Sequence, residues 1–129
     1  RLKGIADVEL PELEMNSPST FRDGRMAMAQ LLDRGEGTLG VFCSSDVVAH
    51  GALAEAHARG CSMPDKLGIV GFGDFDFAPH THPPLTTVRI DRREIGTKAA
   101  RSILRKIEGD KDVEAMINVD FHIVARGTA

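Results

Sequence analysis

The sequence contains no tryptophan and no tyrosine, so any large aromatic surface must come from its six phenylalanines. A sugar ring stacked on an aromatic side chain would have to use one of them. The only cysteines are Cys43 and Cys61, and the sequence has neither a CxxC pair nor an HExxH motif. We therefore expect reduced thiols in a reducing compartment, no disulfide, no metal site and no bound cofactor.

A basic stripe and a long apolar run are also missing. The 129 residues carry a formal net charge of −3, whereas a free-standing nucleic-acid binder usually has a basic face. No apolar run approaches the roughly 18 residues that a membrane span needs. The first residues, RLKGIADVEL, lack the continuous apolar segment of a signal peptide. These absences favour a cytoplasmic globular domain that contacts neither membrane nor nucleic acid by itself.

Short apolar segments alternate with amphipathic helical patterns along the chain. Alternation of this kind predicts an α/β fold built from parallel β–α units. Because the first two apolar segments are almost continuously apolar, we expect them to pair as adjacent parallel strands. Strands are predicted at 38–43, 66–72 and 87–90 and within 115–124, and helices at 21–34, 46–59 and 91–108.

Polar residues follow the first two predicted strands. Ser45 and Asp46 come after strand 38–43, and Gly73 and Asp74 come after strand 66–72. Ligands of open α/β sheets bind outside the carboxyl ends of the strands, so these residues are candidates for a binding site. We expect Asp46 to cap the following helix, which leaves Ser45, one residue earlier, free to face a ligand.

No arrangement of residues indicates catalysis. Cys43 lies inside a strand pattern, which favours a buried small hydrophobe over a nucleophile. Asp74 and Asp76 alternate with phenylalanines, so a role in a turn is favoured over acid–base chemistry. His80 and His82 are spaced as surface or interface residues are. We predict no catalytic residue and no enzyme.

Several motifs in order resemble the carboxyl half of the LacI/GalR family of bacterial repressors. They are FCSSDVVAHGALAEAHARGCSMPDKLGIVGFGD, PPLTTVRID, IGTKAA and a terminal VARGT. THPPLTTVRID is also similar to a gluconate-operon-repressor-like branch. The resemblance implies a periplasmic-binding-protein-like lobe with a doubly wound parallel sheet, incomplete as a fragment. It implies that 1–84 form the second lobe, that 85–109 are a crossover strand and helix of the first lobe, and that 110–129 return to the second.

The resemblance also implies an effector site. Arg1 matches the family's R-x-x-G arginine, which anchors the effector, and Ser19 matches a position that often carries an aromatic ring over the sugar. Ser45 stands where the family usually has an asparagine. Gly73 stands where it usually has an aspartate that binds sugar hydroxyls, next to Asp74. Loss of that carboxylate beside a retained Arg1 would suit an anionic effector, such as the sugar acid gluconate.

Residue type and the resemblance together predict a two-fold dimer surface on helix 46–59 and loop 77–81. Small side chains recur at helical spacing there and permit close approach. The predicted contact residues are His50, Ala54, Phe77, His80 and Thr81.

The predicted function is therefore that of an effector-binding and dimerising region of a LacI-type repressor. It senses a small sugar or sugar acid and controls operator DNA binding by a helix-turn-helix that this chain does not contain. A sugar-binding protein of a transport system shares the fold and stays open as an alternative. An enzyme of the flavodoxin-like type would need a nucleophile or base cluster, which the sequence does not show.

Overall fold

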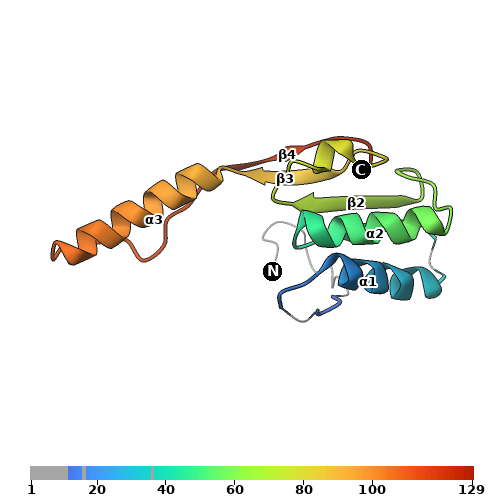
Figure 1. Ribbon diagram of the computed structural model, residues 1–129, viewed down its shortest axis with the longest axis horizontal. Helices are drawn as coiled ribbons and strands as arrows, with labels where there is room; N and C mark the ends of the chain where they lie inside the picture. Colours follow the sequence, from blue (N-terminus) through green and yellow to red (C-terminus); the bar gives the residue numbers. More distant parts are fainter. Residues whose placement is uncertain (1–11, 16, 36) are drawn as a thin grey trace.

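The computed structural model describes residues 12–15, 17–35 and 37–129. Two helices lie on one side of a four-stranded sheet, and a third helix projects away from it (Figure 1). In chain order the elements are α1 (Phe21–Asp33), β1 (Leu39–Phe42), α2 (Asp46–Ala58), β2 (Leu67–Phe72), a short 3-10 helix (Ala78–His80), β3 (Thr86–Ile90), α3 (Arg92–Ile107) and β4 (Phe121–Val124).

The sheet has the order β1-β2-β3-β4, and its first three strands are parallel. Leu39 lies opposite Leu67, and Val70 lies opposite Thr86. The predicted α/β fold with adjacent parallel strands at 38–43 and 66–72 is thus confirmed. β4 runs antiparallel to β3, and it is shorter than the strand predicted within 115–124 because regular pairing is confined to the last four residues of that range.

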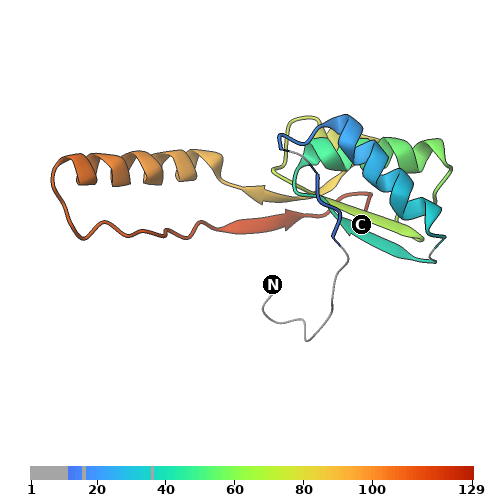
Figure 2. The same ribbon diagram turned by 90° about the horizontal axis from the view of Figure 1, so that it is seen from below.

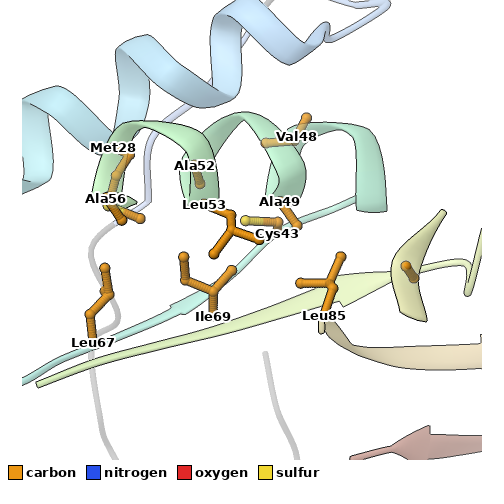
Figure 3. Packing of buried hydrophobic residues seen from close by; sticks show 11 residues of the cluster. Met28, Cys43, Val48, Ala49, Ala52, Leu53, Ala56, Leu67, Ile69 and Leu85 are labelled. Carbon is orange, nitrogen blue, oxygen red and sulfur yellow. The ribbon is translucent and has the colours of Figure 1, made fainter. Parts of the chain in front are cut away.

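The core lies between β2 and the two helices (Figure 3). Alternate residues of β2 are buried, because successive side chains of a strand point to opposite faces and α2 covers one of them. Cys43 is 5% exposed, which confirms the prediction of a buried hydrophobe. Burial, with a smaller contribution from the charge of Asp46, raises the pKa of its thiol to about 12. The cluster comprises Met28, Cys43, Val48, Ala49, Ala52, Leu53, Ala56, Leu67, Ile69, Ala78 and Leu85.

Helices α1 and α2 touch through their backbones. A β-carbon at Gly51 would lie 2.0 Å from the carbonyl oxygen of Phe21, and one at Gly24 would lie 2.1 Å from that of Val48. Both helices lie on the same side of the sheet (Figure 2). Among the described residues no helix covers the opposite side, where Phe42 is 65% exposed.

Thr128 of the terminal VARGT motif hydrogen-bonds to β2 and to the start of β3. The hydroxyl of Thr128 donates to the carbonyl of Ile69 at 2.7 Å and accepts from the Thr86 amide at 2.8 Å. The Ile69 amide donates to the carbonyl of Thr128 at 2.8 Å. Thr128 is fully buried, so the last residues hold β2 and β3 together where the two strands stop pairing directly.

Strands β3 and β4 lead out to α3, which lies clear of the rest of the molecule (Figure 1). We call residues 85–120 the limb. Asp91 caps α3 by accepting from the Glu94 amide at 2.9 Å. No residue of α3 is buried, and its apolar stripe is open, with Ile103 59% and Ile107 75% exposed. The division of the chain into lobe, crossover and return strand stays a prediction.

We predict that residues 85–108 of the limb are the least stable part of the 129-residue chain on its own. Burying an aliphatic side chain is worth about 1.5–3 kcal/mol, and the isoleucines of α3 gain little of this. In the monomeric chain, amides of 95–107 should exchange with solvent faster than those of Leu67–Phe72, measured by hydrogen exchange with mass spectrometry. Equal protection of the two segments in a demonstrated monomer would contradict the crossover assignment.

Candidate functional site

Four of the predicted site residues lie at one edge of the sheet. β1 and β2 are parallel and end there, while α1 and α2 begin there (Figure 1). Ser45 starts α2, Ser19 lies just ahead of α1, and Gly73 and Asp74 follow β2. The fifth predicted residue, Arg1, lies outside the described residues.

The cap of α2 differs from the prediction. Ser45 is the N-cap, and its hydroxyl accepts from the Val48 amide at 3.3 Å. Asp46 is the first helical residue and is fully buried. The prediction that Asp46 caps the helix was wrong because its carboxylate is engaged on the other side, toward the sheet. Ser45 therefore stabilises a helix end at the edge, and its contact with an effector stays a prediction.

The Asp46 carboxylate joins three elements. One oxygen, Oδ1, accepts from the Thr87 hydroxyl of β3 at 2.5 Å, and the other, Oδ2, accepts from the Phe75 amide in the loop after β2 at 2.7 Å. A β-carbon at Gly71 would lie 2.3 Å from Oδ1, so only glycine leaves room for this carboxylate. No local sequence pattern indicates this contact, since the two partners are 29 and 41 residues away along the chain.

Asp74 is held by two arginines. Its backbone has a φ of 48°, a left-handed turn conformation that supports the predicted turn role. Oδ1 accepts from Arg126 Nη2 at 2.7 Å, and Oδ2 accepts from Arg89 Nε. Burial by itself would raise the pKa of Asp74, but the hydrogen bonds from Arg126 and Arg89 outweigh it, and the pKa is lowered. Both carboxylate oxygens are thus already engaged.

An open depression of about 530 Å³ borders this edge and the start of the limb. We call it the junction pocket. Its walls come from the loop after β2, the end of β3, the start of α3 and the residues around the start of β4. The lining residues are Gly73, Asp74, Arg89, Ile90, Asp91, Arg92, Glu94, Asp120 and His122.

Of these nine residues the sequence analysis named only Gly73 and Asp74, and the most informative of those it missed is Arg92. Its Nη2 donates to the carbonyl of Gly73, and its guanidinium lies 4.5 Å from the centroid of the Phe75 ring. The rule that identified Gly73 could have found it, because Arg92 closely follows the carboxyl end of a third parallel strand, β3. Arginine donors beside the Asp91 and Asp120 carboxylates suit a polar ligand with several hydroxyl groups.

We find no catalytic arrangement of side chains among the described residues. Among the residues that the structure describes, no group of three or more histidine, cysteine or acidic side chains could hold a metal ion. The Cys43 thiol is buried and its pKa is raised, which makes it a poor nucleophile.

Of the residues predicted for the dimer surface, His50 and Phe77 lie in contact with each other. His50 lies 5.3 Å from Phe77 between ring centroids, and 5.1 Å from Phe21 of α1. Ala54 is half-buried on α2 and His80 is exposed. The Thr81 hydroxyl donates to the carbonyls of Ala78 at 3.2 Å and Pro83 at 2.9 Å, so it serves its own loop.

Because its pKa is lowered on folding, Asp74 should contribute stability at neutral pH. That contribution is present above the unfolded-state pKa near 4 and is lost as pH falls through the lowered folded-state pKa. We expect Asp74→Asn to lower the free energy of unfolding by about 1–3 kcal/mol at pH 7, and by much less at pH 3, measured by urea titration. Asp65→Asn, in an exposed turn, is the control and should have little effect. A pH-independent loss for Asp74→Asn would contradict the ionic role.

Comparison with known proteins identifies the family. A periplasmic binding protein-like domain matches residues 4–129. The transcriptional repressor CytR of Escherichia coli K12 is 36% identical over 118 residues, which cover 92% of this chain and 35% of CytR. The chain thus spans about a third of the length of this curated relative.

Solved structures agree with this assignment. A LacI-type transcription regulator from Bifidobacterium animalis subsp. lactis is 28% identical with a TM-score of 0.76, over 84% of this chain and 39% of that one. The regulator CelR in complex with cellobiose is 30% identical with a TM-score of 0.78, over 85% of this chain and 34% of that one. The resemblance drawn from the motifs is confirmed: this chain belongs to the periplasmic-binding-protein-like domain family, in the form found in LacI-type transcription regulators.

Proposed function

We propose that this chain is the effector-binding and dimerising part of a LacI-type transcriptional repressor in the cytoplasm. It binds a small sugar or sugar acid and thereby controls operator DNA binding by a helix-turn-helix domain of the same protein. The junction pocket carries this proposal, because its polar lining comes both from the lobe and from the limb. The cellobiose bound by the relative CelR supports an effector of the sugar class.

The position of the pocket explains how binding could be transmitted. Gly73 and Asp74 belong to the loop after β2, whereas Arg92 begins α3 and Asp120 is the last residue of the limb. A ligand that contacts both groups favours one angle between lobe and limb over another. In a two-fold dimer such a rotation changes the spacing of paired DNA-binding heads, which must match the operator half-sites.

The proposal includes no catalytic step and no cofactor, in keeping with relatives that are transcription regulators. The same relatives favour regulation over the transport alternative. In the described part of the chain, no helix combines the length and apolar character needed to cross a membrane.

The direct test uses the full-length protein that contains this chain. Its binding to a fluorescent DNA fragment from upstream of its own operon is followed by anisotropy while gluconate, glucose, ribose or cellobiose is added. At least one of them should change the DNA affinity about tenfold or more, in line with typical allosteric coupling. DNA binding that no ligand alters, together with calorimetry that detects no binding of any of them, would contradict the proposal.

Arg1 is proposed as the anchor of an acidic effector, as the family resemblance implies. A guanidinium binds a carboxylate through two parallel hydrogen bonds, which a lysine ammonium cannot reproduce. In the full-length protein we expect Arg1→Lys to weaken gluconate binding about tenfold or more, measured by calorimetry. Arg93→Lys, on exposed α3, is the matched control. Unchanged affinity would exclude Arg1 as the anchor.

The dimer surface is proposed on α2 and the loop after β2. His50, Ala54 and Ala58 form a stripe of low relief on α2, and Phe21, 39% exposed, lies beside His50. Phe77 extends the same aromatic cluster. In an isologous interface this patch meets its own copy, so small side chains near the axis bring the two helices close.

A charge at the axis tests this surface. Ala54→Glu places two carboxylates close together in the dimer, which should convert the full-length protein to monomers in sedimentation velocity runs at micromolar concentration. The control is Ala115→Glu, in an exposed segment of the limb, which should leave the dimer intact. An unchanged dimer of Ala54→Glu would exclude this surface.

A further inference from the structure

Arg92 is a cation held in a fixed place by uncharged partners. Its Nη2 donates to the carbonyl of Gly73, and its guanidinium stacks over Phe75 at 4.5 Å. Stacking of a guanidinium on an aromatic face restrains its orientation and leaves its edge free. Among the described residues, one of its five N–H donors has a protein acceptor, the Gly73 carbonyl.

Three other charged side chains near Arg92 are already paired. Arg89 and Arg126 both pair with Asp74, and Glu94 pairs with Lys98 at 2.6 Å. In the part of the chain that the structure describes, no carboxylate lies within ion-pair distance of the Arg92 guanidinium.

The two remaining acids of the pocket have different surroundings. The Asp91 carboxylate caps α3 through Oδ1, so its other oxygen remains an acceptor. Asp120 is exposed. Both are suited to accept hydrogen bonds from hydroxyl groups, and both would repel an anion placed directly against them. The anionic end of a ligand therefore fits at Arg92, and its hydroxyl end fits toward Asp91 and Asp120.

Gly73 keeps Arg92 available. A β-carbon at Gly73 would lie 3.6 Å from Arg92 Nη2, so a carboxylate side chain at this position could reach the guanidinium and neutralise it. Glycine has no side chain to do so, and its φ of 121° disfavours any other residue in this conformation. Since the described residues place no carboxylate against Arg92, a ligand can supply the negative charge that pairs with it.

We propose that Arg92 selects the effector by binding its carboxylate or phosphate group, so that the repressor responds to a polyhydroxylated anion rather than to a neutral sugar. This inference rests on the proposed function and specifies its ligand class. It does not depend on Arg1, because every contact that supports it lies within the described residues.

The test compares anionic and neutral ligands of similar size in the full-length protein. Calorimetry with gluconate, glucose 6-phosphate and glucose should show that the wild type binds one or both anions at least about tenfold more tightly than glucose. Which anion binds distinguishes a carboxylate from a phosphate effector. Arg92→Gln should weaken the preferred anion about tenfold to a hundredfold, because a charge-assisted contact is lost, and should leave glucose binding unchanged within about twofold.

Two further variants separate selection from a structural role. Arg92→Lys keeps the charge but not the planar stack, so its affinity for the anion should lie between those of the wild type and Arg92→Gln. Arg93→Gln removes the neighbouring arginine, which does not line the pocket, and should change nothing. All variants should keep the wild-type melting temperature and operator affinity without ligand.

The outcomes distinguish the two proposals. A wild type that binds glucose or cellobiose and releases DNA, but ignores both anions, would overturn the role of Arg92 and leave the proposed function intact. Equal weakening of anion and glucose by Arg92→Gln would also overturn it. A wild type that binds none of these ligands would overturn both.

Discussion

The arrangement of the site depends on the hydrogen bonds of the buried Asp46 carboxylate. Asp46 is the first residue of α2, and its two carboxylate oxygens accept from the Phe75 amide and the Thr87 hydroxyl. One side chain therefore fixes α2, the loop after β2, and β3 relative to one another. A buried carboxylate is tolerated only when its oxygens are hydrogen-bonded. Removing one partner would leave a costly unpaired group, which ties the loop geometry to the stability of the core.

Once the loop is fixed at Phe75, the residues just before it set the electrostatics of the edge. Asp74 lies in a left-handed turn and is held by Arg89 from β3 and Arg126 from the segment after β4. The loop is thereby tied to β3 and to the segment that follows β4. Gly73, between these anchored residues and the end of β2, presents only its carbonyl to the pocket, and Arg92 takes that acceptor. The contacts that stabilise the lobe are therefore the same ones that position the pocket's available cation.

The limb connects the stability of this chain with its proposed function. Its helix has no buried residue, so its apolar stripe needs a partner that is absent from the described residues. A segment whose packing depends on a surface outside its own lobe can respond to a ligand at the junction, because a few kcal/mol of binding energy suffices to shift such an equilibrium. The junction pocket lies at the end of β3 and the start of β4, beside the start of α3.

The sequence by itself determined the helices, the parallel pairing of β1 with β2 and the edge at which the candidate site lies. Apolar segments such as 66–72 and helices such as 21–34 and 91–108 are read from local signals, because periodicity, caps and glycine stops act within a few residues. The motifs also determined the family. The local pattern could not decide which side chain caps α2, since serine and aspartate are both good N-caps. The Asp46 carboxylate instead accepts a hydrogen bond from Thr87, 41 residues away, which leaves Ser45 as the cap. Only the tertiary structure placed Arg92 over Phe75 beside Gly73, because that meeting depends on how β2 and β3 pair and on the angle at which α3 leaves the sheet.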